Sequence, residues 1–181
     1  ERASLTNTGA QAENYTTSEY PSISHDGRFV SFSSGATNLV TGDTNAKRDL
    51  FVRDRKLGTT VRINVTSDGS QITDYATYES QLSGDGRFVV FGSQSSQLAP
   101  GETLYPKQNV YVHELATGKN TLITKGYDGT PANDSSAWNR KADISADGRY
   151  VVFNSFATNL VAGDTNAKRD IFLYDRDAKA I

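Results

Sequence analysis

The sequence contains no cysteine and no methionine among its 181 residues, and only two histidines. Without cysteine there are no disulfides, no thiol catalysis and no cysteine-bound zinc site. Long apolar runs are also missing, since none approaches the roughly 20 residues that a membrane-spanning helix requires. Nor does charge of one sign dominate, because 19 Lys and Arg stand against 21 Asp and Glu. This balance argues against a nucleic-acid partner, which selects a basic surface.

What the sequence does contain is a threefold internal repeat. The segment 24–32 (SHDGRFVSF) returns at 83–91 (SGDGRFVVF) and at 145–153 (SADGRYVVF). The interval of about 60 residues is typical of proteins in which one supersecondary unit packs against the next. We place the units at residues 6–65, 66–124 and 125–181, and assign residues 1–5 to the last unit of a partner chain.

Each repeat predicts four antiparallel strands. An Asp-Gly pair between apolar runs favours a tight hairpin, so residues 22–24 should pair with 29–33. A third strand is expected at 50–53 and a fourth at 61–65, where apolar and polar residues alternate. No segment sustains helical spacing. The predicted fold is therefore all-β, a β-propeller with three four-stranded blades per chain.

These motifs resemble the TolB-like, WD40-like propeller repeat, written S-x-D-G-R-x-(V/I)-x-F and followed by a strand that ends in V-x-D. The third strands at 49–54 (DLFVRD) and 170–175 (DIFLYD) fit the pattern, whereas 109–114 (NVYVHE) departs from it. The resemblance implies a propeller of six to eight blades, used mainly as a binding scaffold and located in the periplasm or outside the cell. Some relatives serve as gating domains of peptidases.

Three blades are too few for a closed ring, because propellers have at least four. Alignment of the repeats places Ile181 at the position of Thr60, and Glu1 at the position of Val61. The simplest assembly is a homodimer of two half-rings, in which residues 1–5 complete the fourth strand of the partner's last blade. The alternative is that the chain is a fragment of a longer protein.

Two loops carry oxygen-bearing side chains that would suit calcium. They hold Asp43, Asn45 and Asp49 in the first repeat, and Asp164, Asn166 and Asp170 in the third. Each loop also contains a Lys-Arg pair, and the second repeat lacks the pattern. We therefore expect turn hydrogen bonds, with Asp49 paired to the neighbouring basic residues, and no metal or cofactor. The Asp-Gly-Arg turns are likewise expected to be structural.

The segments that lead into each blade concentrate aromatic and polar side chains. Such loops gather at one mouth of a propeller channel, where they could hold a sugar or a peptide. The candidate ligand-binding residues are Asn14, Tyr15, Tyr20, Asp74, Tyr75, Tyr78, Asp134, Trp138 and Arg140.

The sequence shows no clear combination of catalytic residues. Its two histidines, His25 and His113, lie at different positions within their repeats, and we expect both to face solvent. The expected function is a non-enzymatic scaffold that binds a protein or a small ligand. The alternatives are a carbohydrate-binding, lectin-like propeller and a hydrolase with its active site in the channel.

Overall fold

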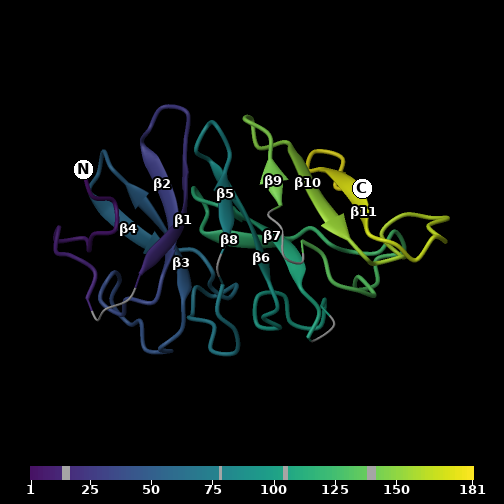
Figure 1. The fold of residues 1–181 in the computed structure, drawn as a ribbon, viewed down its shortest axis with the longest axis horizontal. Helices are drawn as coiled ribbons and strands as arrows, with labels where there is room; N and C mark the ends of the chain where they lie inside the picture. The colour runs from purple at the N-terminus through teal and green to yellow at the C-terminus, as the bar shows by residue number, and fades with distance from the viewer. Residues whose placement is uncertain (14–16, 78, 104–105, 138–141) are drawn as a thin grey trace.

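The computed structural model describes residues 1–13, 17–77, 79–103, 106–137 and 142–181. Within these ranges the chain forms strands and turns and no helix (Figure 1). Accordingly, no described segment forms a helix that could cross a membrane.

The strands form three antiparallel sheets that follow one another along the chain. The first blade contains β1 (Ser18–Ile23), β2 (Phe29–Ser34), β3 (Asp49–Asp54) and β4 (Thr59–Arg62). The second contains β5 (Ser80–Leu82), β6 (Phe88–Ser93), β7 (Asn109–Glu114) and β8 (Lys119–Leu122). The third contains β9 (Asp143–Ile144), β10 (Tyr150–Ser155) and β11 (Asp170–Asp175).

The Asp-Gly turns form the expected hairpins. In the first blade Ile23 pairs with Val30, and Gly27 adopts a φ of 69°, which glycine tolerates without a Cβ clash. The Asp26 carboxylate closes the turn by accepting hydrogen bonds from Ser24 Oγ (2.6 Å) and Arg28 N (2.9 Å). The other two repeats form the same turn, so the repeated motif specifies a repeated hairpin.

Two strand predictions need correction. The fourth strand of the first blade is 59–62 rather than 61–65, because pairing with β3 ends at Arg62 and Val65 instead bridges Gln71. The third blade has three strands within the described chain, not four, and beyond β11 only the bridge between Asp175 and Ala180 extends its sheet.

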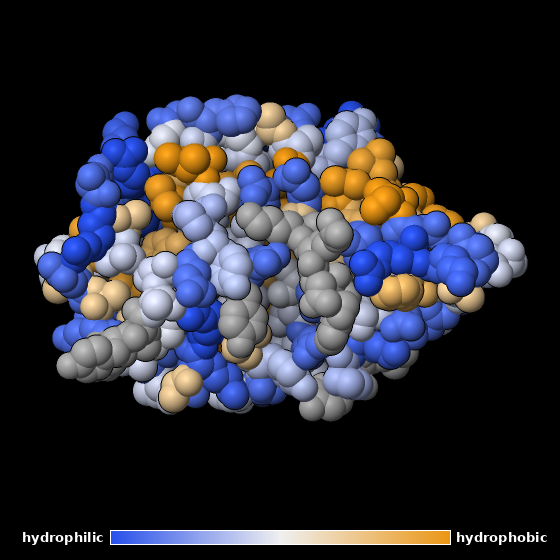
Figure 2. Space-filling view, viewed as in Figure 1, coloured by the Kyte–Doolittle hydropathy of each residue, from blue (hydrophilic) through white to orange (hydrophobic). Residues whose placement is uncertain are grey.

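The blades pack face to face over apolar cores. Leu50 and Val52 of β3 are fully buried against the second blade, where they meet Phe91 and Tyr111. The corresponding residues of the third blade, Ile171 and Leu173 of β11, are instead 71% and 56% exposed. Figure 2 shows apolar atoms gathered over β10 and β11 at this end of the molecule. The third blade therefore exposes an apolar face, whereas the matching faces of the other two blades are covered.

Candidate functional site

The connections opposite the Asp-Gly hairpins form what we call the loop end of the blades. Here the segment entering the second blade is hydrogen-bonded to the β2–β3 loop of the first, with Thr77 N donating to Arg48 O (2.9 Å) and Thr44 N to Gln71 Oε1 (3.1 Å). The next junction repeats the contact through Ser136 N and Gln108 O (2.8 Å). The loop end is therefore a continuous belt that ties each blade to its neighbour.

Two carboxylates among the predicted ligand-binding residues support this belt. Asp74 accepts hydrogen bonds from Ser95 Oγ (2.6 Å) and from Ser96 N (3.0 Å), and so holds the turn after β6. Asp134 pairs with Lys107 Nζ at 2.9 Å. The hydrogen bond from Lys107 lowers the pKa of Asp134. Both carboxylates thus hold together loops of the belt.

The aromatic candidates are only partly described. Tyr20 is 37% exposed in β1, at an irregularity where the backbone adopts a φ of 54°. Tyr75 is half-buried. The remaining candidates lie outside the described residues: Asn14, Tyr15, Tyr78, Trp138 and Arg140. The ligand mouth therefore stays a prediction, with Tyr20 as its described aromatic residue on a first strand.

A buried ion triad lies in the first blade. Arg62 Nη1 is 3.5 Å from Asp43 Oδ1 and 3.6 Å from Asp49 Oδ2, and all three side chains are at most 9% exposed. Burial raises the pKa of both carboxyl groups, and the positive charge of Arg62 opposes that rise. Arg62 Nε and Nη1 have no hydrogen-bond partner among the described residues. The triad thus rests on charge attraction in a poorly solvated site.

The partner of Asp49 differs from our expectation. The sequence suggested Lys47 or Arg48, whereas the structure supplies Arg62 from β4. A signal was present in the repeats, because the second blade replaces Asp49 by Asn109 and Arg62 by Leu122. The acid and the base change together, as expected for two residues that interact.

In the two loops considered for calcium, the amide groups of Asn45 and Asn166 do not direct their oxygen atoms toward the carboxylates. Asn45 Oδ1 accepts a hydrogen bond from Lys47 N (2.8 Å), while its Nδ2 donates to Asp49 Oδ2 (3.1 Å). Asn166 likewise directs Nδ2 at Asp170, 2.9 Å away. A cation would need the amide oxygen, not the NH2 group, beside these carboxylates. The described residues contain no group of three or more His, Cys, Asp or Glu side chains that could hold a metal ion.

The two histidines have different environments. His25 is exposed in its turn, as expected, and its ring lies over Gly84, where a Cβ atom would come within 2.5 Å of Cε1. His113 contradicts the expectation of a solvent-facing residue, because it is 3% exposed and its Nδ1 lies 3.0 Å from Asn120 Oδ1. Burial lowers the pKa of His113. Its partner Asn120 belongs to the outer strand β8, and the repeat pattern alone did not reveal this contact.

The arginines of the Asp-Gly-Arg turns form structural pairs. Arg28 binds Asp54 with two parallel contacts, Nη2 to Oδ2 at 2.7 Å and Nε to Oδ1 at 3.1 Å. Arg149 binds Asp175 in the same way, and this hydrogen bond lowers the pKa of Asp175 to about 2. These pairs tie the hairpin turn to the end of the third strand, as a structural reading of the motif predicts.

The strand order, the repeated hairpins and the stacked sheets define a β-propeller repeat protein. TolB from Acinetobacter baumannii is similar, with a TM-score of 0.51 and 17% identity over 91% of this chain and 31% of that one. The putative TolB from Agrobacterium tumefaciens gives a TM-score of 0.52 and 17% identity over 89% of this chain and 46% of that one. The fold is thus TolB-like, which confirms the expected all-β propeller fold.

A protease domain has the same fold. The β-propeller domain of the Trilobed protease from Pyrococcus furiosus gives a TM-score of 0.54 and 11% identity over 92% of this chain and 41% of that one. The chain thus spans less than half the length of each of these three proteins. No protein-family model matches the sequence, and no curated protein matches it either.

Proposed function

We propose that the chain is a non-enzymatic binding scaffold that recognises a protein or a small ligand at the loop end of its blades. The hydrogen-bonded belt of loops carries this proposal, because loops on a rigid framework are where binding residues concentrate. The buried ionisable side chains also support the proposal, because they contact other residues of the blades: Asp49 lies beside Arg62, and His113 lies beside Asn120.

A phage-displayed random peptide library tests the site. We expect selected peptides to bind the wild-type chain and to lose affinity for Tyr20→Ala. Tyr150→Ala is the matched control, because Tyr150 is 36% exposed, against 37% for Tyr20, and begins β10 at the hairpin end of its blade. Equal loss in both variants, or in neither, would contradict a site at the loop end.

Two further measurements separate the alternatives. Strong binding on a glycan array that Trp138→Ala removes would make the chain a carbohydrate-binding propeller instead. Hydrolysis of generic ester or glycoside substrates that persists through repurification would overturn the non-enzymatic proposal. The contacts of Asp74 and Asp134 favour recognition over catalysis, since Asp74 accepts a hydrogen bond from Ser95 and Asp134 pairs with Lys107, so each carboxylate supports its own loop.

We propose that function needs no calcium. The orientation of the Asn45 and Asn166 amides supports this, since both direct NH2 groups at the carboxylates. A ligand held only by the native state raises stability with its concentration. Millimolar calcium should therefore leave the melting temperature unchanged, and a shift of several degrees, abolished by Asp43→Ala with Asp164→Ala, would contradict the proposal.

We also propose that two copies close a six-bladed ring and that the protein acts in the periplasm or outside the cell. The exposed apolar face at Ile171 and Leu173 supports the ring, because the same positions in the first two blades are covered. The location follows from the family resemblance and from the absence of cysteine.

A further inference from the structure

The first blade shows how a complete outer strand is held at the loop end. Arg62, at the end of β4, lies between the carboxylates of Asp43 and Asp49. Two residues further on, Asn64 Oδ1 accepts a hydrogen bond from Leu50 N (3.0 Å). The end of β4 and the two residues after it therefore supply both a cation for the carboxylate pair and an acceptor for the start of β3.

The second blade keeps the acceptor and changes the charges. Thr124 Oγ1 takes the place of Asn64 and accepts a hydrogen bond from Val110 N (3.2 Å). The positions of Asp43, Asp49 and Arg62 are occupied by Glu102, Asn109 and Leu122. The second blade therefore lacks both the arginine and the second carboxylate. An arginine on the fourth strand thus accompanies the carboxylate pair and is absent where the pair is absent.

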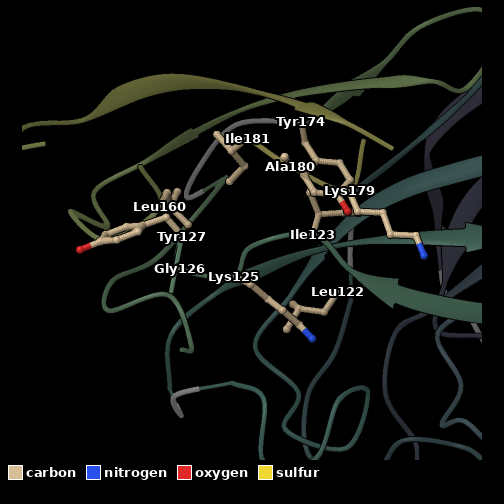
Figure 3. A pocket seen from close by; sticks show the side chains of 10 residues that line it. All are labelled: Leu122, Ile123, Lys125, Gly126, Tyr127, Leu160, Tyr174, Lys179, Ala180 and Ile181. Atoms are coloured by element: carbon tan, nitrogen blue, oxygen red, sulfur yellow. The ribbon is translucent and has the colours of Figure 1, made fainter. Parts of the chain in front are cut away.

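The third blade has the carboxylate pair without an arginine. Asp164 and Asp170 match Asp43 and Asp49, yet neither forms an ion pair with any described residue. Among the described residues, Asn166 alone donates a hydrogen bond to the Asp170 carboxylate. Beside this open edge lies a hollow lined by Ile123, Tyr174 and Ile181, among others (Figure 3).

The N-terminal segment has the residues that this edge lacks. Aligned with the fourth strands, Arg2 falls on Arg62 and Ser4 on Asn64. Arg2 is exposed and forms no ion pair within the described chain. The N-terminal segment therefore carries a cation, Arg2, and a hydrogen-bond acceptor, Ser4, at the two positions where the third blade lacks them.

The conformation of the following residues agrees with this alignment. Leu5 bridges Gln11 as Val65 bridges Gln71, so the chain leaves residues 1–5 as it leaves a fourth strand. Thr60 Oγ1 donates to Leu5 O (2.5 Å), just as Asn120, at the matching position of the second blade, donates to Val65 O (2.8 Å). The start of the chain thus lies against the first blade as the last strand of a preceding blade would.

We propose that the open edge of the third blade binds residues 1–5 of a second copy of this chain, with the Arg2 guanidinium between the carboxylates of Asp164 and Asp170. The Ser4 hydroxyl then accepts a hydrogen bond from Ile171 N. This proposal rests on the six-bladed ring proposed above and names the contact that closes it. In a two-fold dimer each chain gives one such strand and receives one.

The test uses the full chain and sedimentation equilibrium over a range of micromolar concentrations. We expect a wild-type dimer and an increase of about tenfold or more in the dissociation constant of Arg2→Leu, which leaves two carboxylates without their cation. A triple variant, Arg2→Leu with Asp164→Glu and Asp170→Asn, reproduces the residues of the second blade and should regain most of the affinity. Arg87→Leu is the control, because Arg87 is an exposed arginine that pairs with Asp85 in the hairpin turn of the second blade, and this variant should dimerise like the wild type.

The outcomes are distinguishable. A wild-type dimer that Arg2→Leu leaves unchanged would overturn the Arg2 contact while leaving the ring in place. A folded wild-type monomer at micromolar concentration would overturn the second copy as the occupant, and it would favour a segment of a longer chain. Neither result bears on the loop-end site, since peptide binding measures that site separately.

Discussion

At the scale of single residues, Arg62 has the largest predicted effect on stability. It is the one cation beside two buried carboxylates in the described first blade. Arg62→Leu should lower the free energy of unfolding by about 3 kcal/mol, because removing one partner leaves buried charge uncompensated. Urea denaturation at pH 7 measures this loss, and a change below about 0.5 kcal/mol would contradict the role assigned to the triad.

The pH dependence of that loss has a definite sign. A carboxyl group whose pKa is raised by folding favours the native state below its unfolded pKa and loses this contribution as the pH rises through the folded pKa. Burial raises the pKa of Asp43 and Asp49, and removing Arg62 raises it further. The destabilisation by Arg62→Leu should therefore be smaller at pH 4 than at pH 7. Combining it with Asp49→Asn, as in the second blade, should recover part of the stability at pH 7.

His113 should give the native state a second pH dependence. Its pKa is lowered by burial, so the unfolded chain binds the proton more readily than the native chain. The stability that it contributes is complete above the unfolded value of about 6.5 and falls as the pH drops below it. Thermal melting between pH 7.5 and 5 should show this fall, which His113→Gln reduces. His25→Gln, at the exposed turn, is the control and should retain it.

At the scale of elements, the hairpin turns pack against neighbouring blades. Gly148 adopts a φ of 71°, and a Cβ atom there would lie 2.2 Å from Phe88 Cδ2 of the second blade. Gly163 has a φ of 81° but nothing within 4 Å of such an atom. Gly163→Ala should therefore cost only the backbone strain, about 1 kcal/mol, and Gly148→Ala at least twice that. Equal losses of unfolding free energy in the two variants would contradict this packing.

The sequence predicted those elements that short-range chemistry determines. Asp26 and Gly27 are adjacent in the chain, so the hairpin could be located from the sequence alone. The contacts made by Asp74 could not, because Ser95 and Ser96 come from the next connection of the same blade and their proximity depends on the folded sheet. The buried state of His113 was missed for the same reason, since burial depends on how the folded sheets pack and not on the residues next to it in the chain.

At the scale of the whole molecule, the row of three blades exposes apolar side chains at both of its ends within the described chain. Ile171 and Leu173 of β11 are 71% and 56% exposed, whereas the matching residues of the other two blades are buried apolar side chains. At the opposite end of the row of blades Ile23 is 57% exposed, although its counterparts Leu82 and Ile144 are buried. Two apolar end faces of this kind are complementary in a closed ring and exposed in an open one.

Deleting residues 1–5 tests the closed ring through the oligomeric state, because the deletion also removes a contact within the chain, the hydrogen bond from Thr60 Oγ1 to Leu5 O. The 19.7 kDa chain should sediment at twice its mass at micromolar concentration. Without these residues the third blade keeps an unpaired edge at β11, so the truncated chain should melt about 5 °C lower or aggregate. Glu1→Gln is the control for the ion pair between Glu1 and Arg55, which the deletion also removes. Because that pair is exposed, its loss should change little, and a truncated chain that melts and dimerises like Glu1→Gln would show that residues 1–5 do not close the ring.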